Sequence, residues 1–203
     1  MMALQVKFLF LVCLLFAIEL VMAEEKDYSK EERAILNHSV NEVVDALEKE
    51  MKEQFGLRCT GCGGSMPYDI QELDVNFLYC HQVSIEEARE LEIKATERFV
   101  EIINAHEAIR PYLRDYPWDY HRARIMIAFR DKYGKDYPEG VNLILQAKDK
   151  MYYFAPKKSP GDIDHLKEEP YIEAKQIVNS TPSCLKPIVI QPIEKKKKWF
   201  GLF

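Results

Sequence analysis

The fold is decided by one stretch, Val83–Phe129, which reads VSIEEARELEIKATERFVEIINAHEAIRPYLRDYPWDYHRARIMIAF. Ser84 and Glu87 form a capping box, in which each side chain bonds to the other residue's backbone N–H, so we expect a helix to begin at Ser84. Pro111 cannot continue that helix, and Arg124–Phe129 then alternates with the period of a strand. The stretch therefore predicts a helix packed on an antiparallel sheet.

This helix is strongly amphipathic. Its apolar residues recur every three or four positions, the spacing of one helix face: Ala88, Leu91, Ala95, Phe99, Ile102 and Ile103. Charged residues fill the other positions: Glu86, Arg89, Glu90, Lys94, Glu97 and Glu101. We expect the charged side to face solvent.

The rest of the chain supplies the other layers of one domain. Residues 30–55 carry a long apolar stripe between a possible N-cap at Ser29 and a helix-ending glycine at Gly56, which predicts another amphipathic helix. Two further strands are predicted at 141–145, where Leu143 and Leu145 alternate with Asn142 and Gln146, and at 151–155. A short helix is predicted at 169–178, and residues 70–79 fit either a strand or a helical turn. We therefore expect an α+β fold: two amphipathic helices packed on a three-stranded antiparallel sheet, with a short C-terminal helix.

The N-terminal residues predict an export signal. Lys7 precedes an apolar run, Phe8–Ile18, and Val21-Met22-Ala23 suits a signal peptidase. A run of about a dozen residues is too short for a span of roughly 20, which disfavours an uncleaved anchor. We predict the following parts: 1–23 a cleavable signal peptide, 24–29 a flexible leader, 30–178 a single domain with a cysteine-containing loop at 56–82, and 179–203 an irregular basic-aromatic tail. The expected location is outside the cytoplasm, periplasmic or extracellular.

Charge is unevenly distributed along the chain. The 203 residues have a net charge of -5, but from Pro182 onward the net charge is +4, which leaves 24–181 at -9. Because neutralised phosphates supply most of the affinity for nucleic acid, this acidic body argues against a nucleic-acid partner.

Four cysteines remain after signal cleavage: Cys59, Cys62, Cys80 and Cys184. In an exported protein they are expected to form structural disulfides, and joining Cys80 to Cys59 or Cys62 would close a loop of about 20 residues, worth roughly 3 kcal/mol. A zinc site formed by Cys59, Cys62, Cys80 and either His81 or Cys184 is one alternative, and a thiol-redox role for this cysteine cluster is another. No other cofactor is expected.

Aromatic and arginine residues crowd the corner between the central helix and the following strand. Such residues concentrate in binding hot spots, so we regard five of them as a candidate interaction surface: Tyr112, Tyr116, Trp118, Tyr120 and Arg122. The alternative is that these side chains have a structural role and pack between the helix and the sheet.

The C-terminal tail combines cations with large aromatic side chains. A membrane surface attracts Lys and accepts aromatics at its interface, which makes the tail a candidate for contact with a membrane or a partner: Lys195, Lys196, Lys197, Lys198, Trp199 and Phe200.

Known catalytic motifs are absent from the sequence, including Gly-x-Ser-x-Gly, His-Glu-x-x-His and the phosphate loop. We assign no catalytic residue. Our leading hypothesis is an exported, non-enzymatic binding protein whose partner is another macromolecule, most simply a protein. The alternative is a thiol-redox or zinc-binding protein built on Cys59, Cys62 and Cys80.

Overall fold

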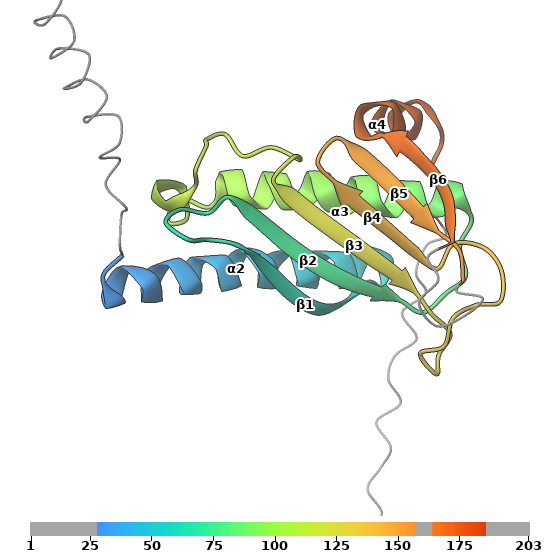
Figure 1. Cartoon of the computed structure of the whole chain (residues 1–203), viewed down its shortest axis with the longest axis horizontal. Helices are drawn as coiled ribbons and strands as arrows, with labels where there is room; N and C mark the ends of the chain where they lie inside the picture. Colours follow the sequence, from blue (N-terminus) through green and yellow to red (C-terminus); the bar gives the residue numbers. More distant parts are fainter. Residues whose placement is uncertain (1–27, 157–163, 186–203) are drawn as a thin grey trace, which may run out of the picture.

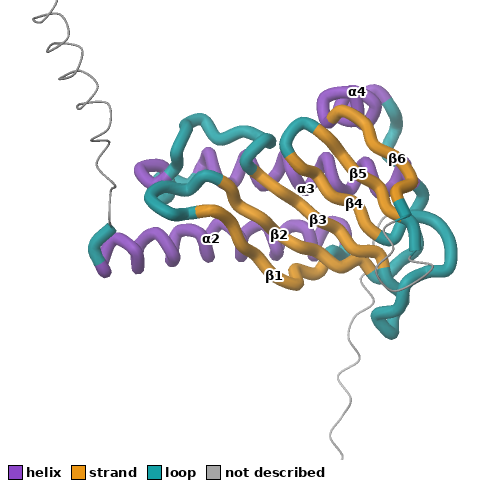
Figure 2. The backbone as a smooth tube through the Cα atoms, viewed as in Figure 1, coloured by secondary structure: helices purple, strands orange, loops and turns teal. Residues whose placement is uncertain are grey.

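The computed structural model describes residues 28–156 and 164–185, which form a six-stranded sheet with helices on one face (Figure 1). The helices are α2 (Lys30–Phe55), α3 (Ile85–Ala105) and α4 (Tyr171–Ser180), with a short 3-10 turn at Arg110–Tyr112. The strands are β1 (Arg58–Ser65), β2 (Glu72–Tyr79), β3 (Ala123–Phe129), β4 (Leu143–Ala147), β5 (Lys150–Phe154) and β6 (His165–Pro170). Figure 2 shows the strands side by side in front of α2 and α3.

The sheet is mixed, and the predicted three-stranded antiparallel sheet was wrong. Its strand order follows the chain, β1-β2-β3-β4-β5-β6. All neighbours are antiparallel except β2 and β3, which run parallel because the chain returns through α3 between them. The α+β class stands, but half of the sheet was missing from the prediction.

The strands missing from the prediction have sequences that are not typical of strands. The predicted cysteine-containing loop at 56–82 contains the β1–β2 hairpin, whose first strand is rich in glycine and cysteine and so has weak strand propensity. Residues 70–79, for which the sequence fitted either a strand or a helical turn, contain strand β2. Strand β6 reads HLKEEP and carries no apolar alternation.

Both long helices are confirmed with their caps. The Ser29 hydroxyl accepts the backbone N–H of Glu32 to begin α2, and Gly56 ends it in a left-handed conformation at φ 70°. The capping box of Ser84 and Glu87 begins α3 as expected.

The core lies between these helices and one face of the sheet. Val43, Leu47 and Met51 of α2 and Phe99 and Ile103 of α3 are buried there. The sheet contributes alternate residues of its central strands: Leu73, Val75, Phe77, Ile125, Ile127, Phe129, Ile144, Met151 and Tyr153. Burying an aliphatic or phenylalanine side chain of this kind stabilises the fold by about 1.5–3 kcal/mol.

The β1–β2 hairpin requires glycine at position 64. A Cβ atom added to Gly64 would lie 2.2 Å from the carbonyl oxygen of Glu72, whereas one added to Gly61 would meet no atom within 4 Å. We expect Gly64→Ala to lower the free energy of unfolding by about 1–3 kcal/mol, measured by chemical denaturation. Gly61→Ala is the matched control and should change it by less than about 0.5 kcal/mol. Equal effects of the two substitutions would contradict this account of the hairpin.

Candidate functional site

The face of the sheet that points away from α2 and α3 carries an apolar surface. Met126 lies opposite Leu145, which lies opposite Tyr152, and these three side chains form one row across the sheet. The next row continues the pattern, and all members are only half-buried. We call this surface the open face and define it by seven residues: Leu78, Met126, Ala128, Leu143, Leu145, Tyr152 and Phe154.

Strand β4 shows how unusual this surface is. A sheet with one solvated face usually places apolar residues inward and polar residues outward. In β4 and the residue before it, Asn142 and Gln146 are buried with Ile144, while Leu143 and Leu145 point outward. The chain thus buries two amide side chains and leaves two leucines on the open face.

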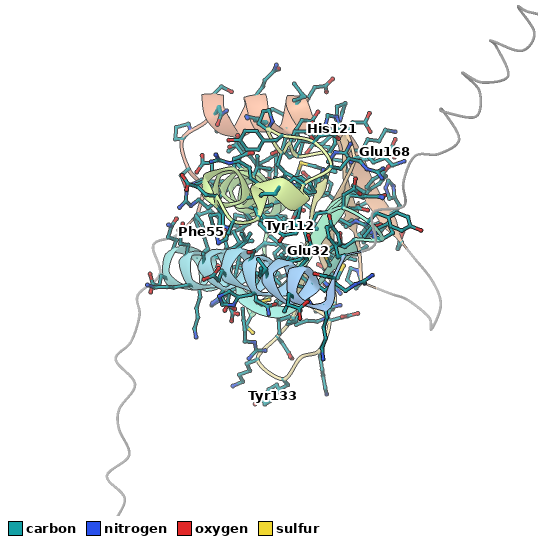
Figure 3. The ribbon with its side chains drawn as sticks, turned by 90° about the vertical axis from the view of Figure 1, so that its left-hand side faces the viewer. Glu32, Phe55, Tyr112, His121, Tyr133 and Glu168 are labelled. Carbon is teal, nitrogen blue, oxygen red and sulfur yellow. The ribbon has the colours of Figure 1, made fainter. Side chains whose placement is uncertain are left out.

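Two charged pairs border the open face at one end, where Arg124 and Lys150 lie in the same cross-strand row. The guanidinium of Arg124 donates to Glu72, with Nε 2.9 Å from Oε1, and its Nε lies 3.4 Å from Asp74. Burial raises the pKa of Asp74, and the charge of Arg124 opposes that rise. At the same end Lys150 of β5 lies 3.1 Å from Glu168 of β6, and Figure 3 shows Glu168 on the side of the sheet opposite the helices.

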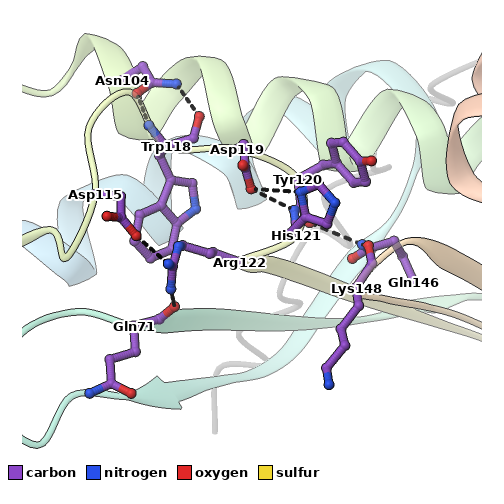
Figure 4. A network of polar contacts seen from close by, with 10 residues as sticks. All are labelled: Gln71, Asn104, Asp115, Trp118, Asp119, Tyr120, His121, Arg122, Gln146 and Lys148. Carbon is purple, nitrogen blue, oxygen red and sulfur yellow. Dashed lines mark hydrogen bonds and ion pairs between the residues drawn. The ribbon is translucent and has the colours of Figure 1, made fainter.

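The aromatic corner predicted as an interaction surface is largely built into the fold (Figure 4). Trp118 is only 2% exposed, and its backbone N–H donates to Oδ1 of Asn104 at 2.7 Å. The ring of Tyr120 stacks on that of Tyr171 at 4.1 Å. The guanidinium of Arg122 pairs with Asp115. It also donates to the backbone carbonyl of Gln71, in the connection between β1 and β2, at 3.1 Å. These contacts fasten the end of α3 to the sheet.

The remaining two members of the corner, Tyr116 and Tyr112, differ in exposure. Tyr116 is 53% exposed, with the guanidinium of Arg110 4.8 Å from its ring centre. Tyr112 is half-buried and packs edge-on against Tyr28 at 5.5 Å. Binding at this corner stays a prediction, with Tyr116 as its most accessible residue.

The four cysteines are free thiols in two separate regions. Cys59 and Cys62 lie on β1, and Cys80 follows the end of β2. Cys184 lies against α3, where its backbone N–H and its thiol both donate to Glu90, at 2.9 Å and 3.0 Å. Burial raises the pKa of the Cys184 thiol to about 11, so this thiol is protonated at neutral pH. The structure therefore separates Cys184 from the other three.

A zinc centre is not assembled in the described part of the chain. No group of three or more His, Cys, Asp or Glu side chains there could hold a metal ion. His81 instead lies beside Tyr79, with ring centres 4.9 Å apart. The signal peptide at 1–23 and the Lys195–Phe200 part of the tail lie outside the described residues, so both remain predictions.

A buried polar cluster links α3 to β5 and β6, and sequence reasoning missed it. Arg89, which was expected in solvent, donates from Nε to Oε1 of Glu169 at 2.7 Å. Tyr153 also donates to Glu169, and Lys167 lies 2.7 Å from it. Burial raises the pKa of Glu169, but these three donors outweigh it and hold that pKa below its ordinary range. Arg89 and Glu169 are 80 positions apart, so no local pattern joins them.

Helix α3 buries three charged-type residues, Arg89, Glu90 and Glu92, and Glu92 is the most deeply buried of them. It is 0% exposed and accepts the backbone N–H of Gln146 at 2.9 Å. Burial raises the pKa of Glu92 well above its ordinary 4.5, and the single hydrogen bond only partly opposes this. Glu92 is therefore a neutral carboxylic acid well above pH 4.5.

This carboxyl makes stability depend on pH. Above about pH 4.5 the unfolded chain loses the Glu92 proton while the folded chain keeps it, so stability falls with rising pH until the folded pKa is reached. Glu92→Gln removes the titration and keeps the shape. We expect the variant to match the native chain near pH 4 and to exceed its free energy of unfolding by about 1.4 kcal/mol for each further pH unit. Urea denaturation at pH 4 to 8 measures this, and a pH-independent difference would contradict it.

No protein family, no curated protein and no solved structure matches this chain. Within residues 28–156 and 164–185, none of the helices has the length and apolar character needed to cross a bilayer. The function is therefore argued from the open face alone.

Proposed function

We propose that this chain is a non-enzymatic binding protein that holds another protein against the open face of its sheet. The observation that carries the proposal is the composition of that face, where Met126, Leu145 and Tyr152 form an apolar row at positions that solvated sheets fill with polar residues. Contiguous apolar surface of this kind marks interaction sites on soluble proteins. The placement of the protein outside the cytoplasm rests on the sequence of residues 1–23.

The shape and size of the surface favour a protein over a small ligand. Small-molecule sites are concave pockets, whereas the open face is the surface of a sheet. Six strands spaced about 4.8 Å apart, each roughly 20 Å long, present about 500 Å². A standard protein interface buries about 800 Å² on each partner, so the sheet face alone supplies more than half of that area.

The arrangement of charge agrees with this interpretation. Protein interfaces have an apolar centre depleted of charge and a polar border. Here the Arg124–Glu72 pair and the Lys150–Glu168 pair border one end of the apolar rows, with Arg124 one row beyond Met126 and Lys150 one row beyond Tyr152. Because these border charges are already paired with one another, the partner we expect is a flat apolar protein surface and not a strongly charged one.

The test uses a photoreactive residue at one of two tyrosines. Benzoylphenylalanine replaces Tyr152 on the open face or, as matched control, Tyr133, which is 74% exposed and projects from the body on a loop (Figure 3). After illumination in the native host, we expect one discrete adduct with a different protein from position 152 and none of the same mass from 133. The adducts are measured by gel shift and identified by mass spectrometry.

A second substitution ties the adduct to the surface. Leu145→Asp introduces a charge beside position 152 and should abolish the adduct while changing the free energy of unfolding by less than about 1 kcal/mol, because Leu145 points outward. The proposal is overturned if position 152 gives no adduct, if both positions give the same adduct, or if the captured protein is a second copy of this chain.

A further inference from the structure

The last residues that the structure describes fold back from α4 onto α3. We call residues 182–185 the strap. They form neither helix nor strand, and Pro182, Ser183 and Cys184 are exposed. Leu185 is half-buried and packs against the hydrophobic core, so the strap has one apolar anchor.

The polar anchor of the strap is a single carboxylate, that of Glu90 on α3. The Ser183 hydroxyl donates to Oε1 of Glu90 at 2.6 Å, and the backbone N–H and the thiol of Cys184 donate to Oε2 at 2.9 Å and 3.0 Å. Glu90 is only 4% exposed, and Nζ of Lys94 lies 2.6 Å from its Oε1. Burial raises the pKa of Glu90, but these donors outweigh it and lower that pKa to about 2. The carboxylate is therefore charged at neutral pH.

The strap has few other attachments. Within the described residues, its hydrogen bonds to the rest of the chain all end on Glu90, and the N–H of Leu185 donates within the strap to the Ser183 hydroxyl at 3.4 Å. Segments with few buried apolar contacts open at a lower free energy than the whole domain. Because the three bonds share one carboxylate and two neighbouring residues, loss of one weakens the others.

We propose that the strap opens and closes on Glu90 as one unit while the rest of the domain stays folded. In the closed state Glu90 accepts from Ser183 and Cys184 together. In the open state these donors bond to water, and Glu90 keeps Lys94 of its own helix as a partner. Opening therefore leaves no buried charge without a partner, which is the condition that makes it accessible.

Opening of the strap changes the reactivity of the Cys184 thiol. In the closed state, burial and the bond to Glu90 raise its pKa from the ordinary 9.0 to about 11. At pH 8 this lowers the fraction of thiolate about a hundredfold, and the greater nucleophilicity of a more basic thiolate recovers about tenfold. The closed strap thus slows the reaction of Cys184 with a thiol reagent about tenfold.

The strap lies where the domain joins the predicted basic-aromatic tail. Leu185 precedes Lys195, the first of the predicted contact residues, by ten positions. A contact that holds the tail would therefore act on the strap and expose the Cys184 thiol. Because the strap lies on α3, it is on the side of the sheet opposite the open face, and its test uses purified protein only. Failure of this proposal leaves the proposed binding function untouched.

The test is hydrogen exchange of the Cys184 amide, whose N–H donates to Glu90. Ser183→Ala removes a different donor and touches neither this amide nor the thiol. If the strap opens as one unit, protection of the Cys184 amide falls about tenfold or more, because a hydrogen bond to a charged group contributes that much. Ser180→Ala is the matched control. The Ser180 hydroxyl donates to the carbonyl of Ile177 and not to Glu90, so protection should stay within about twofold.

Two further measurements distinguish opening of the strap from unfolding of the domain. At pH 8, N-ethylmaleimide should modify Cys184 about tenfold more slowly than the exposed Cys62, and Ser183→Ala should bring the two rates closer. In low concentrations of urea, exchange of the Cys184 amide should stay nearly constant. Exchange of the Ile127 amide in β3 should accelerate, because only unfolding of the domain exposes a large surface.

Three results would overturn the proposal. The first is unchanged protection of the Cys184 amide in Ser183→Ala, or an equal loss in Ser180→Ala. The second is the same urea dependence of exchange at Cys184 and Ile127. The third is a native chain in which Cys184 reacts as fast as Cys62.

Discussion

The rest of the structure depends on the return of the chain through α3. Strands β2 and β3 are neighbours and run parallel, so the chain must cross from the end of one to the start of the other, and α3 makes most of that crossing. The helix can do so only by lying on the sheet, where eleven of its residues are buried. Arg89 then reaches Glu169 of β6, which ties this helix to the far edge of the sheet. The crossing thus decides which face is covered.

Because α3 covers one face of the sheet, it determines which side chains are buried on that face and which are left on the other. Below α3 the sheet must accommodate what the helix buries. Glu92 accepts the backbone N–H of Gln146 there, and Asn142, the residue before β4, is buried as well. An unpaired buried amide or carboxyl is costly, so the sequence accepts a loss of stability in this layer. The same alternation in β4 turns Leu143 and Leu145 outward. A chain selected for stability alone would exchange these positions, and such local conflicts are expected where a surface serves a function.

The sequence was sufficient where the interactions are local. Capping boxes, a helix-ending glycine and 3.6-residue periodicity lie within a few residues of one another, and both long helices were found with their starts. Strands β1 and β6 could not be found in this way, because glycine and charged residues hide them and only pairing with β2 and β5 makes them strands. The open face was missed for a related reason. An alternating strand shows two faces, but only the partner layer decides which of them is buried.

The cysteines show that one extra residue in a strand changes the face on which the following side chains lie. The spacing Cys59-x-x-Cys62 led us to expect structural disulfides, with a zinc site and a redox pair as alternatives, but a spacing does not say where each sulfur points. The bulge at Thr60 decides on which face each sulfur lies. Without it, Cys62 would share the open face with Met126, and Gly61 would point toward the helices. With it, both sulfurs lie beside α2 and glycine occupies the outward position at this edge. One inserted residue therefore places both thiols on the helix side of the sheet and away from the apolar rows.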